Sequence, residues 1–187
     1  TTGMRTDVPA LLEAKARGSI VTSEMEIFFE VCPCTIIGVT GSDGKTTTTS
    51  IIAEMLRAAG KTVYLGGNIG HPLLCDAEKM QPEDFAVVEL SSFQLLDMKR
   101  SPHIAVMMNL APNHLDVHKD MDEYIAAKEN IYLHQHEGDI AIFNEDNDIT
   151  RSLSKKASAR TRLFSRREEV ADGTFLRGDT IVLRHDG

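Results

Sequence analysis

The apolar residues of this chain follow two alternating spacings. Compact apolar runs, typical of buried strands, occupy residues 35–39, 62–65, 85–90, 103–109, 139–143 and 161–164. Amphipathic segments that predict helices occupy residues 46–59, 72–79, 93–98, 121–135 and 147–155. Strands that alternate with helices through short links pair in parallel, with right-handed crossovers. The pattern therefore predicts an α/β fold whose mostly parallel, doubly wound sheet is flanked by helices. Two β-rich runs within residues 175–185 add a terminal β-hairpin.

The N-terminal part of the chain has a different character. We expect a helix, a brief strand and a second helix at residues 7–17, 20–21 and 23–31. Ser23 and Glu26 have the spacing of a capping box at the start of the second helix. Pro33 marks a boundary, and residues 1–33 are too few to form a core of their own. We therefore expect them to be the end of a preceding domain.

A glycine-rich turn with one lysine separates the first long strand from its helix, in the run G-V-T-G-S-D-G-K-T-T-T-T (residues 38–49). Gly41 and Gly44 allow backbone N–H groups to approach a phosphate, and the helix N-terminus adds partial positive charge. Lys45 would neutralise oxygens of the β- and γ-phosphates, and the Thr46 hydroxyl would hold Mg²⁺. The run thus predicts a P-loop that binds a nucleotide. Its predicted binding residues are Gly41, Ser42, Asp43, Gly44, Lys45, Thr46 and Thr47.

This turn is a variant of the usual P-loop. Val39 stands where the motif has its first glycine, and Gly38 lies one residue earlier. The helix that follows has apolar residues at helical spacing, namely Ile51, Ile52, Met55, Leu56 and Ala59. The alternative is an ordinary glycine turn with a solvated lysine. The flanking strand and helix favour the phosphate loop.

Glu89 lies near the end of the apolar run F-A-V-V-E-L, which is typical of a strand covered on both faces. Ligands of open α/β sheets bind beyond the carboxyl ends of the strands, so Glu89 is placed to share a Mg²⁺ with the phosphate loop. The alternative is a surface glutamate at a frayed strand end. Ser91, Ser92 and Gln94 follow directly and could contact a ligand in the same crevice.

Two histidines, His114 and His118, follow the strand that ends at Asn109. On a helix their spacing would direct both at one metal, but Pro112 and the lack of a third strong ligand argue against a zinc site. They could be ordinary loop histidines. The position of His114 at the carboxyl edge of the sheet makes it a candidate functional residue.

Lys128 lies within the apolar stripe of the helix predicted at residues 121–135. The stripe consists of Met121, Tyr124, Ile125, Ile131 and Tyr132. A lysine there could extend its alkyl stem and place the ammonium in water. Alternatively, it points into the active crevice, where desolvation favours the neutral, nucleophilic amine.

Composition narrows the class of protein. The chain has 187 residues, of which 42% are hydrophobic and 26% charged, as in a soluble globular domain. The net charge of −8 argues against a nucleic-acid surface. No apolar run reaches the ~20 residues of a membrane helix, and no segment resembles a signal peptide. We therefore expect a cytoplasmic protein that contacts neither nucleic acid nor membrane. We also expect a monomer.

The three cysteines form no disulfide framework. Cys32 and Cys34 stand in C-P-C and Cys75 lies far away in sequence, which falls short of a four-ligand zinc set. We interpret them as reduced, mostly structural thiols.

Five motifs stand in the order G-V-T-G-S-D-G-K-T-T-T-T, G-G-N-I-G, E-L-S-S-F-Q-L, H-L-D-V-H and Y-I-A-A-K. Together they resemble the Mur ligase family of peptidoglycan synthesis, and the resemblance spans essentially the whole chain. The family's nucleotide loop is similar to Gly-x-Thr-Gly-x-Asn-Gly-Lys-Ser/Thr, which accounts for the displaced Gly38. The form E-L-S-S-F-Q-L resembles the members that add D-glutamate, since sister ligases and folylpolyglutamate synthetase carry other residues there.

The resemblance implies ATP and Mg²⁺ as cofactors. It assigns the ATP phosphates to Lys45 and Mg²⁺ to Thr46 and Glu89. It implies that the region of the muramoyl substrate and a second metal is lined by Asn68, Ser91, Gln94 and His114. Lys128 would be modified to a carbamate that positions a metal ion. The implied catalytic residues are Lys45, Glu89, His114 and Lys128, and the implied metal ligands are Thr46, Glu89, His114 and carbamylated Lys128. Asn113 departs from the family, where many relatives have Asp or Glu.

The implied reaction adds D-glutamate to UDP-N-acetylmuramoyl-L-alanine in two steps. The alanyl carboxylate attacks the γ-phosphate of ATP to form an acyl phosphate, and the amine of D-glutamate then displaces phosphate. By this resemblance residues 1–33 are the tail of a UDP-binding N-terminal domain. Residues 34–187 would be an incomplete central ATP-binding domain, and the C-terminal domain would be absent. We therefore expect the 187 residues to bind nucleotide without ligating.

Other classes of function stay open at this point. Another Mur ligase or a folylpolyglutamate synthetase-like ligase would share most of the motifs. A generic P-loop kinase or ATPase requires no role for Lys128. A non-catalytic nucleotide-binding module would bind ATP without any effect of bicarbonate.

Overall fold

The structure, a computed structural model, describes residues 7–111 and 118–185. Its eight strands form one sheet in the order β2-β3-β1-β4-β5-β6-β7-β8. The strands are β1 (Thr35–Thr40), β2 (Val63–Gly67), β3 (Phe85–Glu89), β4 (Ile104–Met107), β5 (Ile140–Asn144), β6 (Arg160–Ser165), β7 (Gly173–Arg177) and β8 (Thr180–Arg184). All neighbours pair in parallel except β7 and β8, which form the terminal hairpin. The predicted fold class is confirmed.

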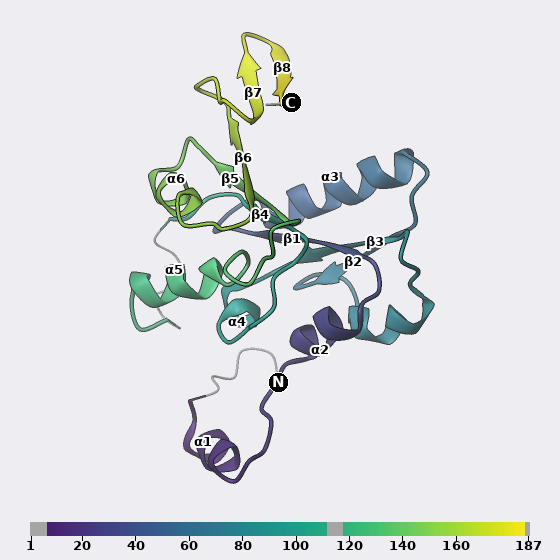
Figure 1. Cartoon of the computed structure of the whole chain (residues 1–187), viewed down its shortest axis with the longest axis vertical. Helices are drawn as coiled ribbons and strands as arrows, with labels where there is room; N and C mark the ends of the chain where they lie inside the picture. Colours follow the sequence, from purple (N-terminus) through teal and green to yellow (C-terminus); the bar gives the residue numbers. More distant parts are fainter. Residues whose placement is uncertain (1–6, 112–117, 186–187) are drawn as a thin grey trace.

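Helices cover both faces of the sheet, as a doubly wound fold requires (Figure 1). The helices of the described chain are α1 (Pro9–Ala16), which lies apart from the sheet, α2 (Glu24–Val31), α3 (Lys45–Ala58), the 3₁₀ helix η1 (Leu73–Lys79), α4 (Ser92–Leu95), α5 (Met121–Glu129) and α6 (Asp148–Ser154). One core cluster lies between the sheet and α3, through Ala53. A larger cluster joins the opposite face to residues of α2, η1, α4, α5 and α6.

The apolar stripe of α3 differs from the predicted one. Ile52 and Leu56 pack against the core beside Ala53, as predicted. Ile51 is 53% exposed, Met55 is 67% exposed and Ala59 is exposed too, so the prediction that these three residues belong to the apolar face was wrong. A helix that covers a flat sheet buries one narrow stripe, and Thr49, fully buried, occupies part of it.

Two other sequence predictions need correction. Residues 20–21 form no strand, because no other described segment pairs with them and Ile20 is 91% exposed.

The helix predicted at residues 121–135 ends at Glu129, where Asn130 donates its side-chain amide to the carbonyls of Leu95 and Leu96. The chain then continues in turns that still bury Ile131 and Tyr132. Apolar spacing alone does not reveal such an end.

The parallel pairing of β6 and β7 is unusual because residues 166–172 alone connect them. A parallel connection normally needs a dozen or more residues. Here Leu163, two residues before the end of β6, pairs with Gly173, the first residue of β7. The loop therefore runs back along β6 by the length of only two residues before β7 begins, and residues 166–172 are enough to make this connection.

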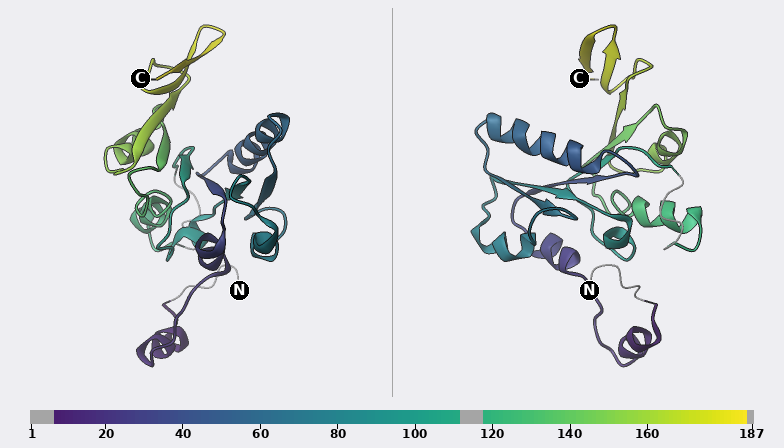
Figure 2. Two further views of the ribbon diagram at one scale, coloured as in Figure 1. Left: turned by 45° about the vertical axis from the view of Figure 1, so that its right-hand side comes forward. Right: turned by 180° about the vertical axis from the view of Figure 1, so that it is seen from behind.

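Both ends of the described chain extend from the central layers. Figure 2 shows the β7–β8 hairpin projecting on one side of the molecule and α1 on the other. None of the residues of α1 is buried. By contrast, α2 buries Met25, Phe28 and Phe29 in the core. The proposed domain boundary near Pro33 stays a prediction. In the described part of the chain, no helix combines the length and apolarity needed to cross a membrane.

Candidate active site

The predicted phosphate loop connects β1 to α3, at the point where the neighbours of β1 are β3 and β4. This is the position where the strand order reverses, and ligands of such sheets bind there. Gly44 is the N-cap of α3 with a φ of 78°, and Gly41 has a φ of 156°. A Cβ at Gly41 would lie 2.9 Å from the Cβ of Met108. The loop therefore requires glycine at these two positions.

Gly38, the displaced glycine of the motif, has a different role. It lies inside β1, and an added Cβ would lie 2.7 Å from the Cγ of Pro102 and 3.0 Å from the Cδ1 of Leu90. Gly38 therefore allows close packing around the central strand, while the turn itself starts at Gly41.

Asn109 holds the loop from the adjacent strand. Its side-chain oxygen accepts a hydrogen bond from the Asp43 N–H at 2.9 Å, and its amide donates to the Asp43 carbonyl at 3.2 Å. Its backbone carbonyl accepts from the Ser42 N–H at 2.8 Å. The sequence interpretation assigned no role to Asn109. The sequence did contain a signal for this role, because Asn109 lies just beyond the carboxyl end of β4, as Glu89 lies at the end of β3.

Lys45, Thr46 and Glu89 lie together at the carboxyl edge of the sheet. The Thr46 hydroxyl donates to one carboxylate oxygen of Glu89 at 2.7 Å, and the side-chain amide of Asn68 donates to the other at 2.9 Å. Glu89 is 2% exposed, so it is not the frayed surface glutamate of the alternative interpretation. The Lys45 ammonium donates to the carbonyls of Gly41 and Ser42, at 3.0 and 3.1 Å. It therefore folds back over the loop.

The Thr46 and Glu89 oxygens suit a Mg²⁺ ion. Mg²⁺ prefers hard oxygen ligands and usually takes only one or two carboxylates, with phosphates and water completing its octahedron. The 2.7 Å between the two oxygen atoms is close to the roughly 3 Å between adjacent ligands of an octahedral Mg²⁺. These residues could hold the ion that the family resemblance implies.

Lys128 is buried beneath the same loop. It is 1% exposed, which excludes the snorkelling alternative. Its ammonium donates to the Thr40 hydroxyl and to the Gly41 carbonyl, both at 3.0 Å. Desolvation, followed by repulsion from Lys45, lowers the pKa of Lys128 to about 7, although Glu89 opposes the shift. Near neutral pH a large share of this amine is therefore neutral and nucleophilic.

Tyr124 connects the phosphate loop to Lys128 and was not predicted to do so. Its hydroxyl lies 3.0 Å from the Ser42 hydroxyl, and the Lys128 nitrogen lies 5.0 Å from the centre of its ring. Burial raises the pKa of Tyr124, so its hydroxyl stays protonated. Tyr124 precedes Lys128 by one helical turn in the motif Y-I-A-A-K, and this motif was the signal in the sequence.

The predicted substrate residues Ser91 and Gln94 form a capping box at the start of α4. The Gln94 N–H donates to the Ser91 hydroxyl, and the Ser91 N–H donates back to the Gln94 side chain. His118 is buried, and its Nε2 lies 2.8 Å from the Ser92 hydroxyl. His114 and Asn113 lie outside the described residues.

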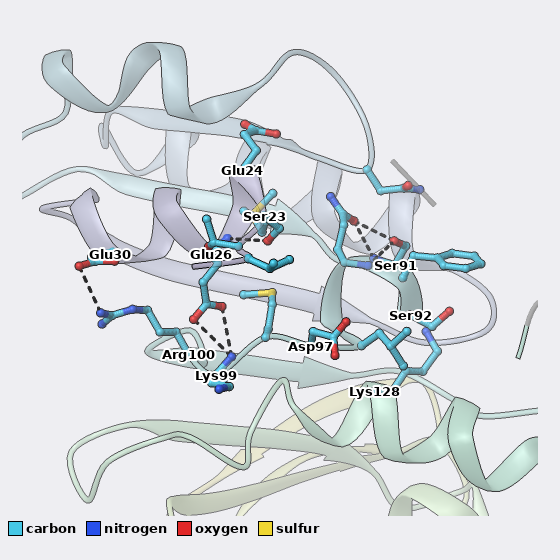
Figure 3. A pocket seen from close by; sticks show the side chains of 18 of the residues that line it. Ser23, Glu24, Glu26, Glu30, Ser91, Ser92, Asp97, Lys99, Arg100 and Lys128 are labelled. Atoms are coloured by element: carbon cyan, nitrogen blue, oxygen red, sulfur yellow. Dashed lines mark hydrogen bonds and ion pairs between the residues drawn. The ribbon is translucent and has the colours of Figure 1, made fainter. Parts of the chain in front are cut away.

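A cavity of about 1040 Å³ is lined by several of these groups, whereas Thr46, Glu89 and His118 are not among its lining residues. Gly41, Lys45, Asn68, Gln94 and Lys128 all line it. Figure 3 shows Ser91, Ser92 and Lys128 on one side of the cavity and the pairs Glu26–Lys99 and Glu30–Arg100 on the other. The N-terminal residues 20–26 also line the cavity, a contribution that sequence reasoning missed.

Gly67 sets the distance between the ends of β2 and β3. It pairs with Glu89 and has a φ of 100°, and an added Cβ would lie 2.2 Å from the Glu89 carbonyl oxygen. We expect Gly67→Ala to lower the free energy of unfolding by about 2–4 kcal/mol, because the strand ends must separate. The matched control is Gly60→Ala. Its φ is 77° and it has open space around it, so about 1 kcal/mol of backbone strain is expected. Urea unfolding measures both, and equal losses would contradict the steric argument.

Comparison with known proteins identifies the family. The description "Mur ligase middle domain" matches residues 39–185, more than half of the chain. The chain belongs to the Mur ligase family. The predicted recognition is confirmed, and a P-loop kinase or ATPase unrelated to this family is excluded.

The Mur ligase relatives include "UDP-N-acetylmuramoylalanine--D-glutamate ligase" from Clostridium novyi, which is 52% identical over 183 residues. The protein of the same name from Acetivibrio thermocellus is 52% identical over 184 residues. Each alignment covers 98% of this chain but 40% of the relative. The chain therefore spans about 40% of the length of these relatives.

Solved Mur ligase structures share the fold. The MurF ligase from Thermotoga maritima in complex with ADP superposes with a TM-score of 0.65 at 23% identity, over 87% of this chain and 42% of that one. The ligase described as MPL from Neisseria meningitides gives 0.64 at 18% identity, over 98% and 63%. Identities this low support the fold alone.

Proposed function

We propose that this chain is the central ATP-binding part of a cytoplasmic ligase that joins D-glutamate to UDP-N-acetylmuramoyl-L-alanine in peptidoglycan synthesis. The observation that carries the proposal is the 52% identity to ligases of that name over nearly the whole chain. The cavity that gathers Lys45, Asn68 and Lys128 supports it. Its substrates are small molecules, and we propose that it works as a monomer without nucleic acid or membrane.

ATP would bind at the phosphate loop. Backbone N–H groups of residues 41–47 and the N-terminus of α3 would receive the phosphates. Lys45 would exchange its two carbonyl contacts for the β- and γ-phosphate oxygens, because a phosphate is a stronger partner for an ammonium than a neutral carbonyl. Asn109 and Tyr124 would keep the loop in place during this exchange.

Thr46 and Glu89 would hold Mg²⁺, which would neutralise charge on the phosphates of ATP when bound. Asn68 orients the carboxylate of Glu89 by donating to its second oxygen. Lys128 in its neutral form would attack CO₂, form an N–C bond and lose a proton, leaving a carbamate as a further ligand. Ser91, Gln94 and His114 would contact the muramoyl substrate.

For the chemistry we propose the two-step reaction that the family resemblance implies. The alanyl carboxylate of the nucleotide substrate attacks the γ-phosphate, ADP leaves, and an acyl phosphate forms. Lys45 stabilises the charge that develops on the phosphoryl group. The amine of D-glutamate then attacks the acyl carbon, phosphate leaves, and the amide product forms.

A chimera tests this function. The corresponding segment of the Clostridium novyi ligase is replaced by this chain, and D-glutamate-dependent phosphate release is measured. We expect the chimera to retain activity, and Lys128→Ala to abolish it in a way that short carboxylic acids rescue. A chimera that folds and binds ATP but forms no product would contradict the proposal.

The isolated chain gives a second prediction. It covers 40% of its relatives' length, so we expect it to bind ATP with Mg²⁺ but to release no phosphate when the nucleotide substrate and D-glutamate are added. Calorimetry measures binding, and a phosphate assay measures turnover. D-glutamate-dependent phosphate release by these 187 residues alone would refute the expectation.

A further inference from the structure

Three sulfur atoms meet on the side of the core formed by α2 and η1, away from the phosphate loop. Cys32 is the C-cap of α2, Cys34 directly precedes β1, and Met80 is the C-cap of η1. The two Sγ atoms are 3.4 Å apart. The Sδ of Met80 lies 3.7 Å from the Sγ of Cys32 and 4.0 Å from the Sγ of Cys34. None of these residues has a role in the proposed ligase chemistry.

The surrounding fold holds this cluster in place. Cys34 is 2% exposed and Met80 is 3% exposed, so both side chains are packed on all sides. Cys32 is half-buried and provides access from solvent. Pro33 separates the cysteines and has a restricted φ, and Cys32 has the extended backbone (φ −67°, ψ 119°) typical of a residue before proline. The thiol pair is therefore pre-organised by the backbone.

The three separations define a nearly equilateral triangle. One point in its plane lies about 2.1–2.2 Å from all three sulfur atoms, and metal–thiolate bonds are about 2.3 Å long. An ion slightly above the plane would reach all three ligands without movement of the backbone. The spacing is thus that of a trigonal metal site.

The type of ligand selects the metal. Thiolate and thioether sulfurs are soft ligands that favour Cu(I), whereas structural zinc sites take four ligands from Cys, His and carboxylates. Within residues 7–111 and 118–185, no group of three or more His, Cys, Asp or Glu is arranged to bind a metal. Two cysteines and one methionine therefore fit a three-coordinate soft ion better than zinc.

Charge at the cluster also favours a cation. The carboxylate of Asp84 lies near Cys34 and adds negative charge beside the sulfur atoms. A bound cation would replace the proton of Cys34 and offset the negative charges. Binding releases one proton from each protonated thiol.

We propose that Cys32, Cys34 and Met80 form a trigonal Cu(I) site that connects the end of α2 to the end of η1. The site is separate from the phosphate loop, and the proposal does not depend on the ligase function. Cu(I) binding would join the segment that precedes β1 to the central domain.

Copper binding by the full 187-residue chain tests the site. Cu(I) is supplied without oxygen as its acetonitrile complex, with bicinchoninate as competitor. We expect one Cu(I) per chain and, by X-ray absorption, three sulfur neighbours at about 2.3 Å. Cys32→Ser and Cys34→Ser should each lower the affinity for Cu(I) by about 100-fold or more. If Cys34→Ser does not fold, Cys34→Ala takes its place in the measurement.

Two further variants make the test specific. Met80→Leu keeps the volume of the side chain and should lower the affinity about 10-fold, leaving two sulfur neighbours. Cys75→Ser is the matched control, because Cys75 is exposed and should be dispensable. Copper retained by a Cys32→Ser, Cys34→Ser double variant would overturn the proposal. The proposal would also be overturned if Met80→Leu still showed three sulfur neighbours. The same holds if Cys75→Ser lost as much copper affinity as the Cys32 and Cys34 variants.

Discussion

Replacing Lys128 by methionine is expected to remove a large pH dependence of stability. The pKa of Lys128 is about 7 in the folded chain, against an ordinary value of 10.5. Between these values the unfolded chain holds a proton that the folded chain lacks. Raising the pH lowers the proton activity, which disfavours the state that holds the additional proton, here the unfolded chain. The folded state therefore gains stability by up to about 1.4 kcal/mol per pH unit.

The full gain in the free energy of unfolding that Lys128 contributes between pH 7 and pH 10.5 is on the order of 4 kcal/mol. Burial and Glu129 raise the pKa of Tyr132, which destabilises the folded state above about pH 10. This contribution is common to both proteins, so the difference between wild type and Lys128→Met isolates Lys128. Urea unfolding from pH 6.5 to pH 10 measures it.

The exposed Lys61 offers a matched control for this experiment. Lys61→Met should follow the wild-type curve across the whole range. A Lys128→Met variant with the wild-type pH dependence would show that the buried amine is charged at neutral pH. It would also remove the physical basis for the attack of Lys128 on CO₂.

Replacing Lys45 by alanine is expected to weaken ATP binding about 100-fold, because charge-assisted bonds to phosphate are among the strongest in proteins. The loss should be larger for ATP than for AMP, since Lys45 would contact only the β- and γ-phosphates. Isothermal titration calorimetry with Mg²⁺ measures both nucleotides.

Lys61→Ala, just after the turn that follows the C-terminal end of α3, is the control for the loss of one positive charge. It should bind ATP as the wild type does. If Lys45→Ala and Lys61→Ala bound ATP equally well, the loop would be an ordinary glycine turn. The fold of the Lys45 variant is checked by its unfolding curve.

Short-range patterns were sufficient for most of the fold. The strands of the parallel sheet consist of β-branched and apolar runs whose limits agree with the structure to within about two residues. The phosphate loop was recognisable because Gly41, Gly44 and Lys45 are adjacent in the chain. Glu89 was recognisable because a carboxylate in a buried strand needs a partner.

Long-range contacts were not predictable in the same way. The helix at residues 121–135 ends early because Asn130 bonds to carbonyls more than thirty residues away. The strand expected at residues 20–21 lacks a partner, which no local pattern reports. Asn109 and Tyr124 support the loop through contacts with Asp43 and Ser42, which lie far from them in sequence.

The sequence by itself determined the family, the α/β class and the chemistry of the loop, because these depend on residue types at fixed spacing. Only the tertiary structure decided that Lys128 is buried beneath Gly41 rather than solvated, because burial depends on how a helix packs against a distant turn. It also decided that the Sδ of Met80 lies beside the two thiols of the C-P-C motif. Cys34 and Met80 are 46 positions apart in the sequence, and only packing brings their sulfur atoms together.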